Sequence, residues 1–259
     1  MREMLCFDQV SLTYQAENGE VEALRDISFC VREGELVAIV GPSGCGKSTL
    51  LSLASGLTMP TAGQICVAGT PVTGVSGKTG YMLQKDNLLD WRTIRANTML
   101  GLEIRGIAVN RDYADELLHT YGLWDFRDKH PAQLSGGMRQ RVALIRTLAP
   151  KPELLLLDES FSALDYQTRL AVADDVHSIL KREQKTAVIV THDISEAISM
   201  ADRLIVLSKR PGRIRHQLTI AFGASEPDGT CHVPPLKRRD DPLFRAYFNE
   251  IWKELDVHV

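Results

Sequence analysis

The sequence predicts an α/β protein with a mostly parallel core sheet, an N-terminal antiparallel β region and a helical subdomain. Short, fully apolar runs predict buried parallel strands at residues 36–40, 154–157 and 187–190. Each run precedes a segment of helical pattern, at residues 48–57, 166–183 and 193–201. Strands that alternate with helices form parallel sheets covered on both faces, so this order predicts the fold class.

The other segments complete this expected organisation. Strand-like runs flank a polar turn within residues 5–31, which predicts the antiparallel region. Residues 93–150 are mostly helical in pattern. We expect one domain at 1–221, with the helical subdomain at about 93–150, and then a segment at 222–259. This last segment reads as a loose linker rich in Gly, Ser, Pro and Asp, followed by a short helix over 241–255.

Composition excludes several classes of function. The chain has 259 residues, 44% hydrophobic and 24% charged, with a net charge of −3. This is the balance of a globular protein, and it lacks the basic field that a nucleic-acid-binding protein needs. The 5 cysteines are odd in number and form no C-x-x-C pair, so we expect neither a disulfide framework nor a zinc site. No apolar run approaches the roughly 20 residues of a membrane span.

A phosphate-binding loop is predicted at Gly41–Thr49, which reads GPSGCGKST and matches G-x-x-x-x-G-K-[ST]. It follows a predicted strand and opens a predicted helix, as this motif requires. Its glycines let backbone N–H groups face an anion, and the helix N-terminus favours negative charge. Lys47 would contact the β- and γ-phosphates, and Ser48 would bind Mg²⁺. The candidate ATP ligands of the loop are Gly41, Pro42, Ser43, Gly44, Cys45, Gly46, Lys47, Ser48 and Thr49.

A pair of acids follows the apolar run at 154–157. Asp158 and Glu159 stand at the carboxyl end of this predicted strand, where ligands bind in open α/β sheets. Neighbouring strand residues point in opposite directions. We therefore expect Asp158 to serve Mg²⁺ through its water shell and Glu159 to activate the attacking water.

A further segment points to one family. Residues 134–140 read LSGGMRQ, which resembles the signature motif of ABC-type ATPases, with Met138 in place of the more usual glutamine. The resemblance implies that Ser135, Gly136 and Gly137 of one subunit close over ATP bound to another. It therefore implies a homodimer whose cofactors are ATP and Mg²⁺.

Other family motifs occur in the expected order over about residues 5–215. The resemblance implies that Tyr14 stacks on adenine, that Gln84 reaches Mg²⁺ and the water, and that His192 contacts the γ-phosphate. It implies a D-loop at the dimer interface, formed by Ser162, Ala163, Leu164 and Asp165. Ser160 departs from the family pattern, because proline is frequent at that position.

The resemblance implies an ATPase subunit of an importer. It would lie peripherally at the cytoplasmic face of the membrane, with separate permease subunits and, indirectly, a solute-binding protein as partners. Residues 88–93 and 208–214 look like the nitrate/sulfonate/taurine branch, which includes carriers of thiamine-precursor pyrimidines. In the family, the segment Lys85–Thr93 meets a permease helix. Trp91 is the better interface candidate, whereas Leu88 and Leu89 fit local packing equally well.

Two other classes are weighed against this interpretation. The alternative is a soluble, non-transport ABC ATPase of translation or DNA repair, which usually has two cassettes or a long coiled-coil insertion. No sustained heptads occur between Ser48 and Leu134. Small kinases and GTPases with a phosphate loop are disfavoured by the signature and by the absence of an Asn-Lys-x-Asp motif.

Overall fold

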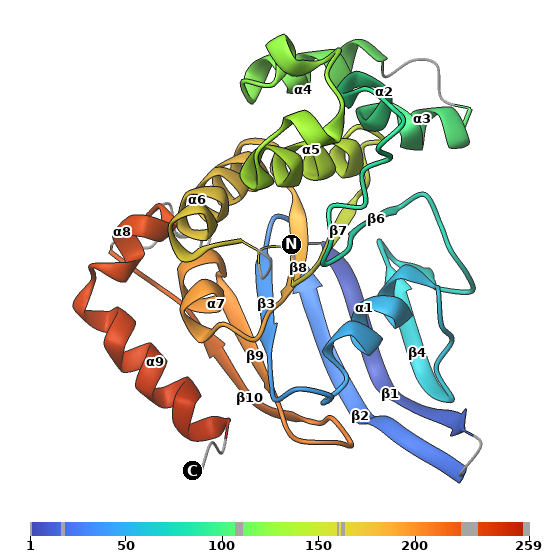
Figure 1. Cartoon of the computed structure of the whole chain (residues 1–259). Coiled ribbons are helices and arrows are strands. Elements are labelled where there is room, and N and C mark those ends of the chain that lie inside the picture. Colours follow the sequence, from blue (N-terminus) through green and yellow to red (C-terminus); the bar gives the residue numbers. More distant parts are fainter. Residues whose placement is uncertain are drawn as a thin grey trace.

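Two β-sheets organise the residues described by the computed structural model, which are 2–16, 19–106, 111–159, 161, 164–223 and 233–255 (Figure 1). The antiparallel sheet has the order β2-β1-β4-β5. Its strands are β1 (Glu3–Ala16), β2 (Gly19–Arg32), β4 (Ala62–Val67) and β5 (Thr70–Pro71). The second sheet has the order β10-β9-β3-β8-β7-β6 and is parallel except for β10. Its strands are β3 (Leu36–Val40), β6 (Thr79–Met82), β7 (Leu154–Asp158), β8 (Thr186–Val190), β9 (Arg203–Leu207) and β10 (Ile214–Thr219).

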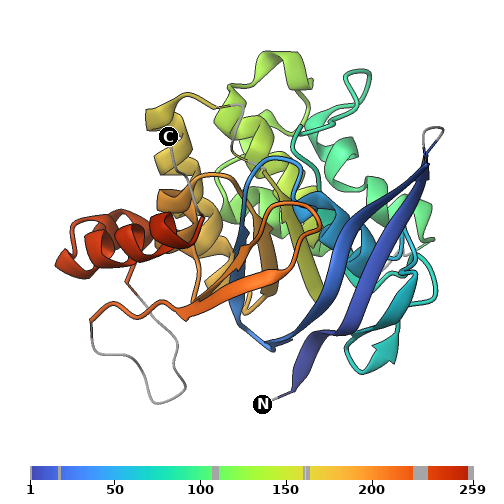
Figure 2. The same cartoon turned by 90° about the horizontal axis from the view of Figure 1, so that it is seen from below.

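Helices cover both faces of the parallel sheet. The helices are α1 (Lys47–Ser55), α2 (Ile94–Thr98), α3 (Leu100–Ile104), α4 (Arg111–Thr120), α5 (Gly136–Leu148), α6 (Tyr166–Arg182), α7 (Ile194–Met200), α8 (Pro235–Arg239) and α9 (Pro242–Glu254), with short 3₁₀ helices η1 (Trp124–Phe126) and η2 (Pro131–Gln133). In Figure 1, α2 to α5 gather at one end of the molecule. Both Figure 1 and Figure 2 place α9 on the side opposite to β1 and β2. Within the described ranges, no helix combines the length and apolar character of a membrane span.

Burial on both faces explains the fully apolar strands. In β7, Leu154 and Leu156 pack into the core shared with α1 and the antiparallel sheet. Leu155 and Leu157 point to the opposite face and pack with residues of α5 and α6. Because successive strand residues face opposite sides, a strand between two cores has no polar position to alternate with. The predicted fold class is confirmed.

The C-terminal segment differs from the predicted loose linker at 222–240. Residues 224–232 lie outside the described part of the chain, but α8 is a helix and Arg238 is 0% exposed. Its guanidinium donates hydrogen bonds to the carbonyls of Val233 and Ala201, both at 2.8 Å, and lies over the Phe222 ring. A buried arginine is tolerated when such acceptors satisfy it. The domain boundary at 221 stays a prediction.

One cysteine pair contradicts the expectation that the chain has no disulfide. Cys6 of β1 and Cys30 of β2 stand opposite each other in register and form a disulfide, with Cα atoms 4.1 Å apart. Cys45 and Cys66 are free, and Cys231 lies outside the described residues. The sequence separation of 24 residues carries no pairing signal, because only the strand register brings these two residues together.

We expect Arg238→Ala to lower the free energy of unfolding by about 2–4 kcal/mol, because it leaves buried carbonyl groups without their charged donor. The measurement is urea denaturation followed by circular dichroism. The control is Lys237→Ala, which removes an exposed cation of the same helix and should change stability by about 0.5 kcal/mol or less. Equal effects of the two substitutions would contradict the structural role of Arg238.

Candidate functional site: a phosphate-loop pocket and a separate signature cavity

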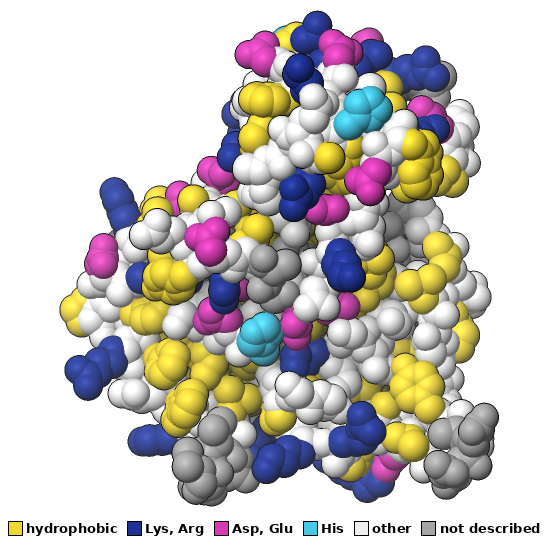
Figure 3. Space-filling view, viewed as in Figure 1, with side chains coloured by type: hydrophobic (Ala, Val, Ile, Leu, Met, Phe, Trp, Pro, Cys, Tyr) yellow, Lys and Arg dark blue, Asp and Glu magenta, His cyan; other side chains and the backbone are white. Residues whose placement is uncertain are grey.

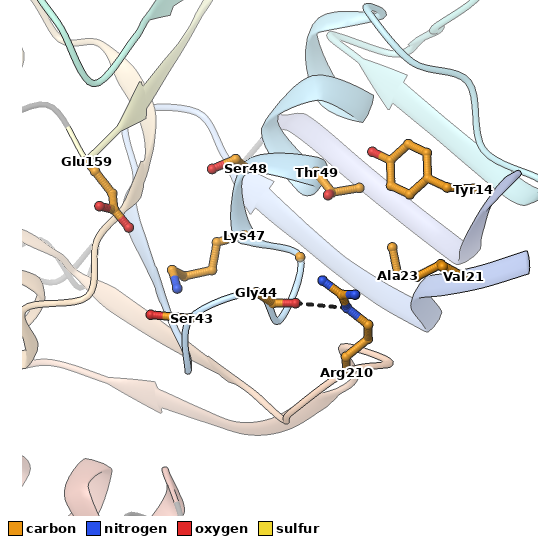
Figure 4. Close-up of a pocket in the computed structure, with 11 residues that line it drawn as sticks. Tyr14, Val21, Ala23, Ser43, Gly44, Lys47, Ser48, Thr49, Glu159 and Arg210 are labelled. Carbon is orange, nitrogen blue, oxygen red and sulfur yellow. Dashed lines mark hydrogen bonds between the residues drawn. The ribbon is translucent and has the colours of Figure 1, made fainter. Parts of the chain in front are cut away.

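The phosphate loop lines a pocket of about 470 Å³ between β3 and α1 (Figure 4). The loop contributes Ser43, Gly44, Gly46, Lys47, Ser48 and Thr49, and other elements contribute Tyr14, Val21, Ala23, Glu159 and Arg210. Gly46 precedes α1 with a φ of 103°, a left-handed conformation that favours glycine. A Cβ atom there would lie 2.6 Å from the side chain of Leu24, so the loop requires glycine for space as well.

The remaining loop residues form its inner layer. The backbone N–H of Cys45 donates to the carbonyl of Pro42 at 3.2 Å. The Cys45 side chain is 1% exposed and therefore faces the core, and burial raises the pKa of its thiol. Lys47 Nζ donates to the carbonyls of Gly41 at 2.8 Å and Pro42 at 3.1 Å. Gly41, Pro42 and Cys45 thus shape the loop, and the carbonyl groups of the first two hold its lysine. Their predicted contact with ATP stays a prediction.

Ser48 and Asp158 join the start of α1 to the end of β7. Ser48 Oγ donates to Asp158 Oδ1 at 3.0 Å, and the Tyr81 hydroxyl donates to Oδ2 at 3.2 Å. Burial raises the pKa of Asp158, while these two hydrogen bonds act in the opposite direction. Burial, together with the charge of Asp158, also raises the pKa of Tyr81, which therefore remains a donor. A hydroxyl and a carboxylate side by side are hard oxygen ligands of the kind that Mg²⁺ takes.

The side chains of Asp158 and Glu159 diverge because the chain turns at Glu159, and not because strand residues alternate in direction. The strand ends at Asp158, and Glu159 has a φ of 43°, a left-handed conformation that is uncommon for glutamate. Its N–H donates to the carbonyl of Val190 at 2.8 Å, which fixes the turn against β8. The carboxylate Oε2 lies 3.1 Å from His192 Nδ1 and faces the phosphate pocket. Backbone strain of this kind often marks functional residues.

Tyr14 and Gln84 lie at two different edges of this region. Tyr14 of β1 is 41% exposed and lines the pocket together with its cross-strand partner Val21. Gln84 follows β6, whose parallel pairing with β7 places it at the same carboxyl edge of the sheet as Asp158. Its side chain is exposed.

The signature residues line a second cavity of about 530 Å³. Ser135 caps α5 by accepting a hydrogen bond from the N–H of Met138 at 3.3 Å, and Gly136 and Gly137 form the first turn. Leu164 and Asp165 of the predicted D-loop line the same cavity. The other predicted D-loop residues, Ser162 and Ala163, lie outside the described part of the chain, as does Ser160.

The two cavities share no residue among those the structure describes. The N-terminus of α5 therefore offers N–H groups and its positive dipole end to a cavity separate from the phosphate loop. Among the described residues, one chain thus presents two helix N-termini to two different cavities, and neither cavity includes residues of the other.

Arg210 is a charged pocket residue that sequence reasoning missed, as it missed the pocket residues Val21 and Ala23. It lies in the turn between β9 and β10, and its Nε donates to the carbonyl of Gly44 at 3.2 Å. The segment 208–214 was informative in the sequence only as a mark of one family branch. A polar turn that contains an arginine has no local pattern that predicts a pocket, and the contact joins residues 166 positions apart.

Similarity to known proteins agrees with these motifs. Residues 24–162 match the family model described as "ABC transporter". The chain is 45% identical to the uncharacterized ABC transporter ATP-binding protein YtlC of Bacillus subtilis, over 96% of this chain and 94% of the relative. It is 41% identical to the nitrate import ATP-binding protein NrtD of Synechocystis, over 92% and 90% of the two chains. It is 37% identical to the taurine import ATP-binding protein TauB of Roseobacter denitrificans, over 96% and 94%.

A solved structure shows the same fold. The dimeric, post-hydrolysis structure of the ATP-binding cassette MJ0796, bound to ADP and Pi, superposes with a TM-score of 0.71 at 31% identity. The similarity covers 84% of this chain and 99% of that structure. With a phosphate loop, an acid pair after β7 and a signature at the start of α5, the chain belongs to the ABC transporter family and is an ATPase of that family.

Proposed function

We propose that this ATPase energises the import of a small solute through a separate membrane permease. The observation that carries the proposal is similarity over more than nine-tenths of the chain to nitrate and taurine import ATP-binding proteins. The solute is then a sulfonate- or nitrate-like anion or a thiamine-precursor-like molecule, delivered by a solute-binding protein. The subunit lies peripherally at the cytoplasmic face of the membrane.

The two separate cavities support a homodimer. A phosphate bound by Lys47 of one copy is enclosed from both sides only if the signature cavity of a second copy covers it. Ser135 and the two glycines after it would supply the second set of N–H donors. Leu164 and Asp165 line the signature cavity and would lie at the interface between the copies. The dimeric cassette structures of MJ0796 support this arrangement.

Mg²⁺ fits the oxygen ligands of this site. Ser48 would bind the ion directly, Asp158 through its water shell, and Gln84 would approach from the edge of the sheet. When bound, the ion neutralises charge on the β- and γ-phosphates. The rest of the phosphate charge is met by Lys47 and by the N–H groups at the start of α1.

Glu159 is the proposed general base. Its carboxylate faces the pocket that Lys47 lines, where it can accept a proton from the attacking water. His192 lies 3.1 Å from this carboxylate, and its proposed role is to contact the γ-phosphate. The left-handed turn at Glu159 keeps this carboxylate apart from Asp158, so that one acid serves the metal and the other the water.

We expect Glu159→Gln to lower the rate of ATP hydrolysis on the order of 10²-fold or more, because it removes the base and keeps the side-chain shape. ATP binding should persist, and an ATP-bound dimer should appear on gel filtration. The contrasting variant is Lys47→Ala, which should weaken ATP binding itself because its charge contacts the phosphates in the ground state. Near-normal turnover of Glu159→Gln would remove Glu159 from this role.

Trp91 is the proposed contact with the permease. The three apolar residues of this segment differ in their burial. Leu88 is 8% exposed and packs in the core with the helical region, whereas Trp91 is 76% exposed. Leu89 is half-buried, and its N–H donates to the side chain of Asn97 at 2.7 Å. A tryptophan this exposed, on a loop held by such packing, suits a protein interface.

Trp91→Ala should leave the ATPase activity of the isolated subunit intact. It should weaken assembly with the permease by about 2 kcal/mol, since buried aromatic residues dominate interface energies. The measurements are ATP hydrolysis in solution and permease pull-down from membranes, on one preparation. The matched control is Trp252→Ala, which removes a second exposed tryptophan, on α9. Unchanged pull-down for Trp91→Ala would place the coupling surface elsewhere. A failure of the wild type to bind any permease would favour a non-transport ATPase.

A further inference from the structure

The turn between β9 and β10 is attached to the edge of β2. The N–H of Gly212 donates to the carbonyl of Ala23 at 2.9 Å, and the N–H of Arg25 donates to the carbonyl of Gly212 at 3.0 Å. Ala23 itself lines the phosphate-loop pocket. Residues 208–213 are therefore held by backbone hydrogen bonds to a strand that forms the pocket wall.

The same turn also fits closely against the phosphate loop. A Cβ atom on Gly212 would lie 2.1 Å from the carbonyl oxygen of Cys45 and 3.0 Å from the side chain of Leu24. Distances this short exclude a larger residue unless the backbone moves. Only glycine lets the turn approach the loop this closely. The position of the turn relative to the loop is consequently set by backbone contacts on two sides.

Arg210 extends from this turn into the pocket. Its Nε donates to the carbonyl of Gly44 at 3.2 Å, and its Nη2 would lie 3.4 Å from a Cβ atom on Gly44. In Figure 4 the guanidinium lies between Lys47 and Tyr14. All of these residues line the same pocket.

No acid among the described residues neutralises the charge of Arg210. Within the part of the chain that the structure describes, Arg210 forms no ion pair. Arg213, at the end of the same turn, instead pairs with Asp26 at 3.4 Å. With Nε bound to a carbonyl, Arg210 keeps the N–H groups of both Nη atoms for a ligand. Charged side chains of both signs are interspersed on the face of the molecule seen in Figure 3.

We propose that Arg210 binds the α-phosphate of the nucleotide. Tyr14 marks the base end of the pocket, and Lys47 with Ser48 marks the end of the β- and γ-phosphates. A side chain between these ends faces the ribose and the α-phosphate, and a guanidinium matches two phosphate oxygens with two parallel N–H donors. The ligand class is a nucleoside di- or triphosphate. The inference rests on nucleotide binding by the family and not on import.

Arg210→Ala tests this role through dissociation constants for ATP, ADP and GTP, measured by titration calorimetry. The affinities for ATP and ADP should both fall roughly tenfold, the size expected for one charge-assisted contact in a partly open site. The ratio of ATP to GTP affinity should stay unchanged, because both nucleotides carry an α-phosphate. The matched control is Lys209→Ala, which removes the neighbouring exposed cation of the same turn and should leave all three constants as in the wild type.

Several outcomes would overturn the proposal. Unchanged ATP affinity excludes the contact, and a loss for ATP without a loss for ADP moves it to the γ-phosphate. A changed ATP to GTP ratio means that Arg210 contacts the base. An equal loss of affinity in Lys209→Ala would mean that the effect comes from net charge and not from a direct contact. Thermal unfolding without nucleotide checks that the variant is folded. If Arg210→Ala is not folded, Arg210→Gln replaces it, because glutamine keeps much of the side-chain length without the charge. Wild-type nucleotide affinity in that variant also overturns the proposal.

Discussion

The parallel pairing of β3, β8 and β7 is the constraint on which the site depends. Parallel strands end at the same edge of a sheet, so the loop after β3, the acids after β7 and the histidine after β8 meet there. The hydrogen bond from Ser48 to Asp158 joins two of these ends directly. All three strands are buried on both faces, and each packs into more than one hydrophobic core, which fixes the position of this edge.

Each charged group at this edge has a hydrogen-bond or ion-pair partner that offsets the cost of its placement. Lys47 is 6% exposed, and its ammonium group is satisfied by loop carbonyls. Asp158 accepts two hydroxyl hydrogen bonds against the cost of its burial. Glu159, in contrast, lies beyond the strand end and pairs with an exposed imidazole. The more buried carboxylate thus suits binding of a metal, and the more open one suits exchange of a proton with water.

The separation of the phosphate loop from the signature cavity links the fold to its function. Helix α5 begins after Ser135 in the helical region. Helix α1 begins at Lys47 and packs against strands of both sheets. Two helix N-termini in different cavities cannot enclose one phosphate from opposite sides in a single chain. A nucleotide enclosed by both therefore requires a second copy. This requirement gives a physical reason why the proposed homodimer would depend on nucleotide.

The sequence by itself determined the fold class, the phosphate loop, the acid pair and the signature, because each is a local pattern. An apolar run, a glycine-rich turn and a helix start lie within about ten residues of one another, and backbone geometry acts over that range. Only the tertiary structure decided the disulfide of Cys6, the burial of Arg238, the turn that directs Glu159 to His192 and the place of Arg210 in the pocket. Each of these depends on strand register or on a loop docking against distant chain, and such contacts leave no periodic trace in the sequence around either partner.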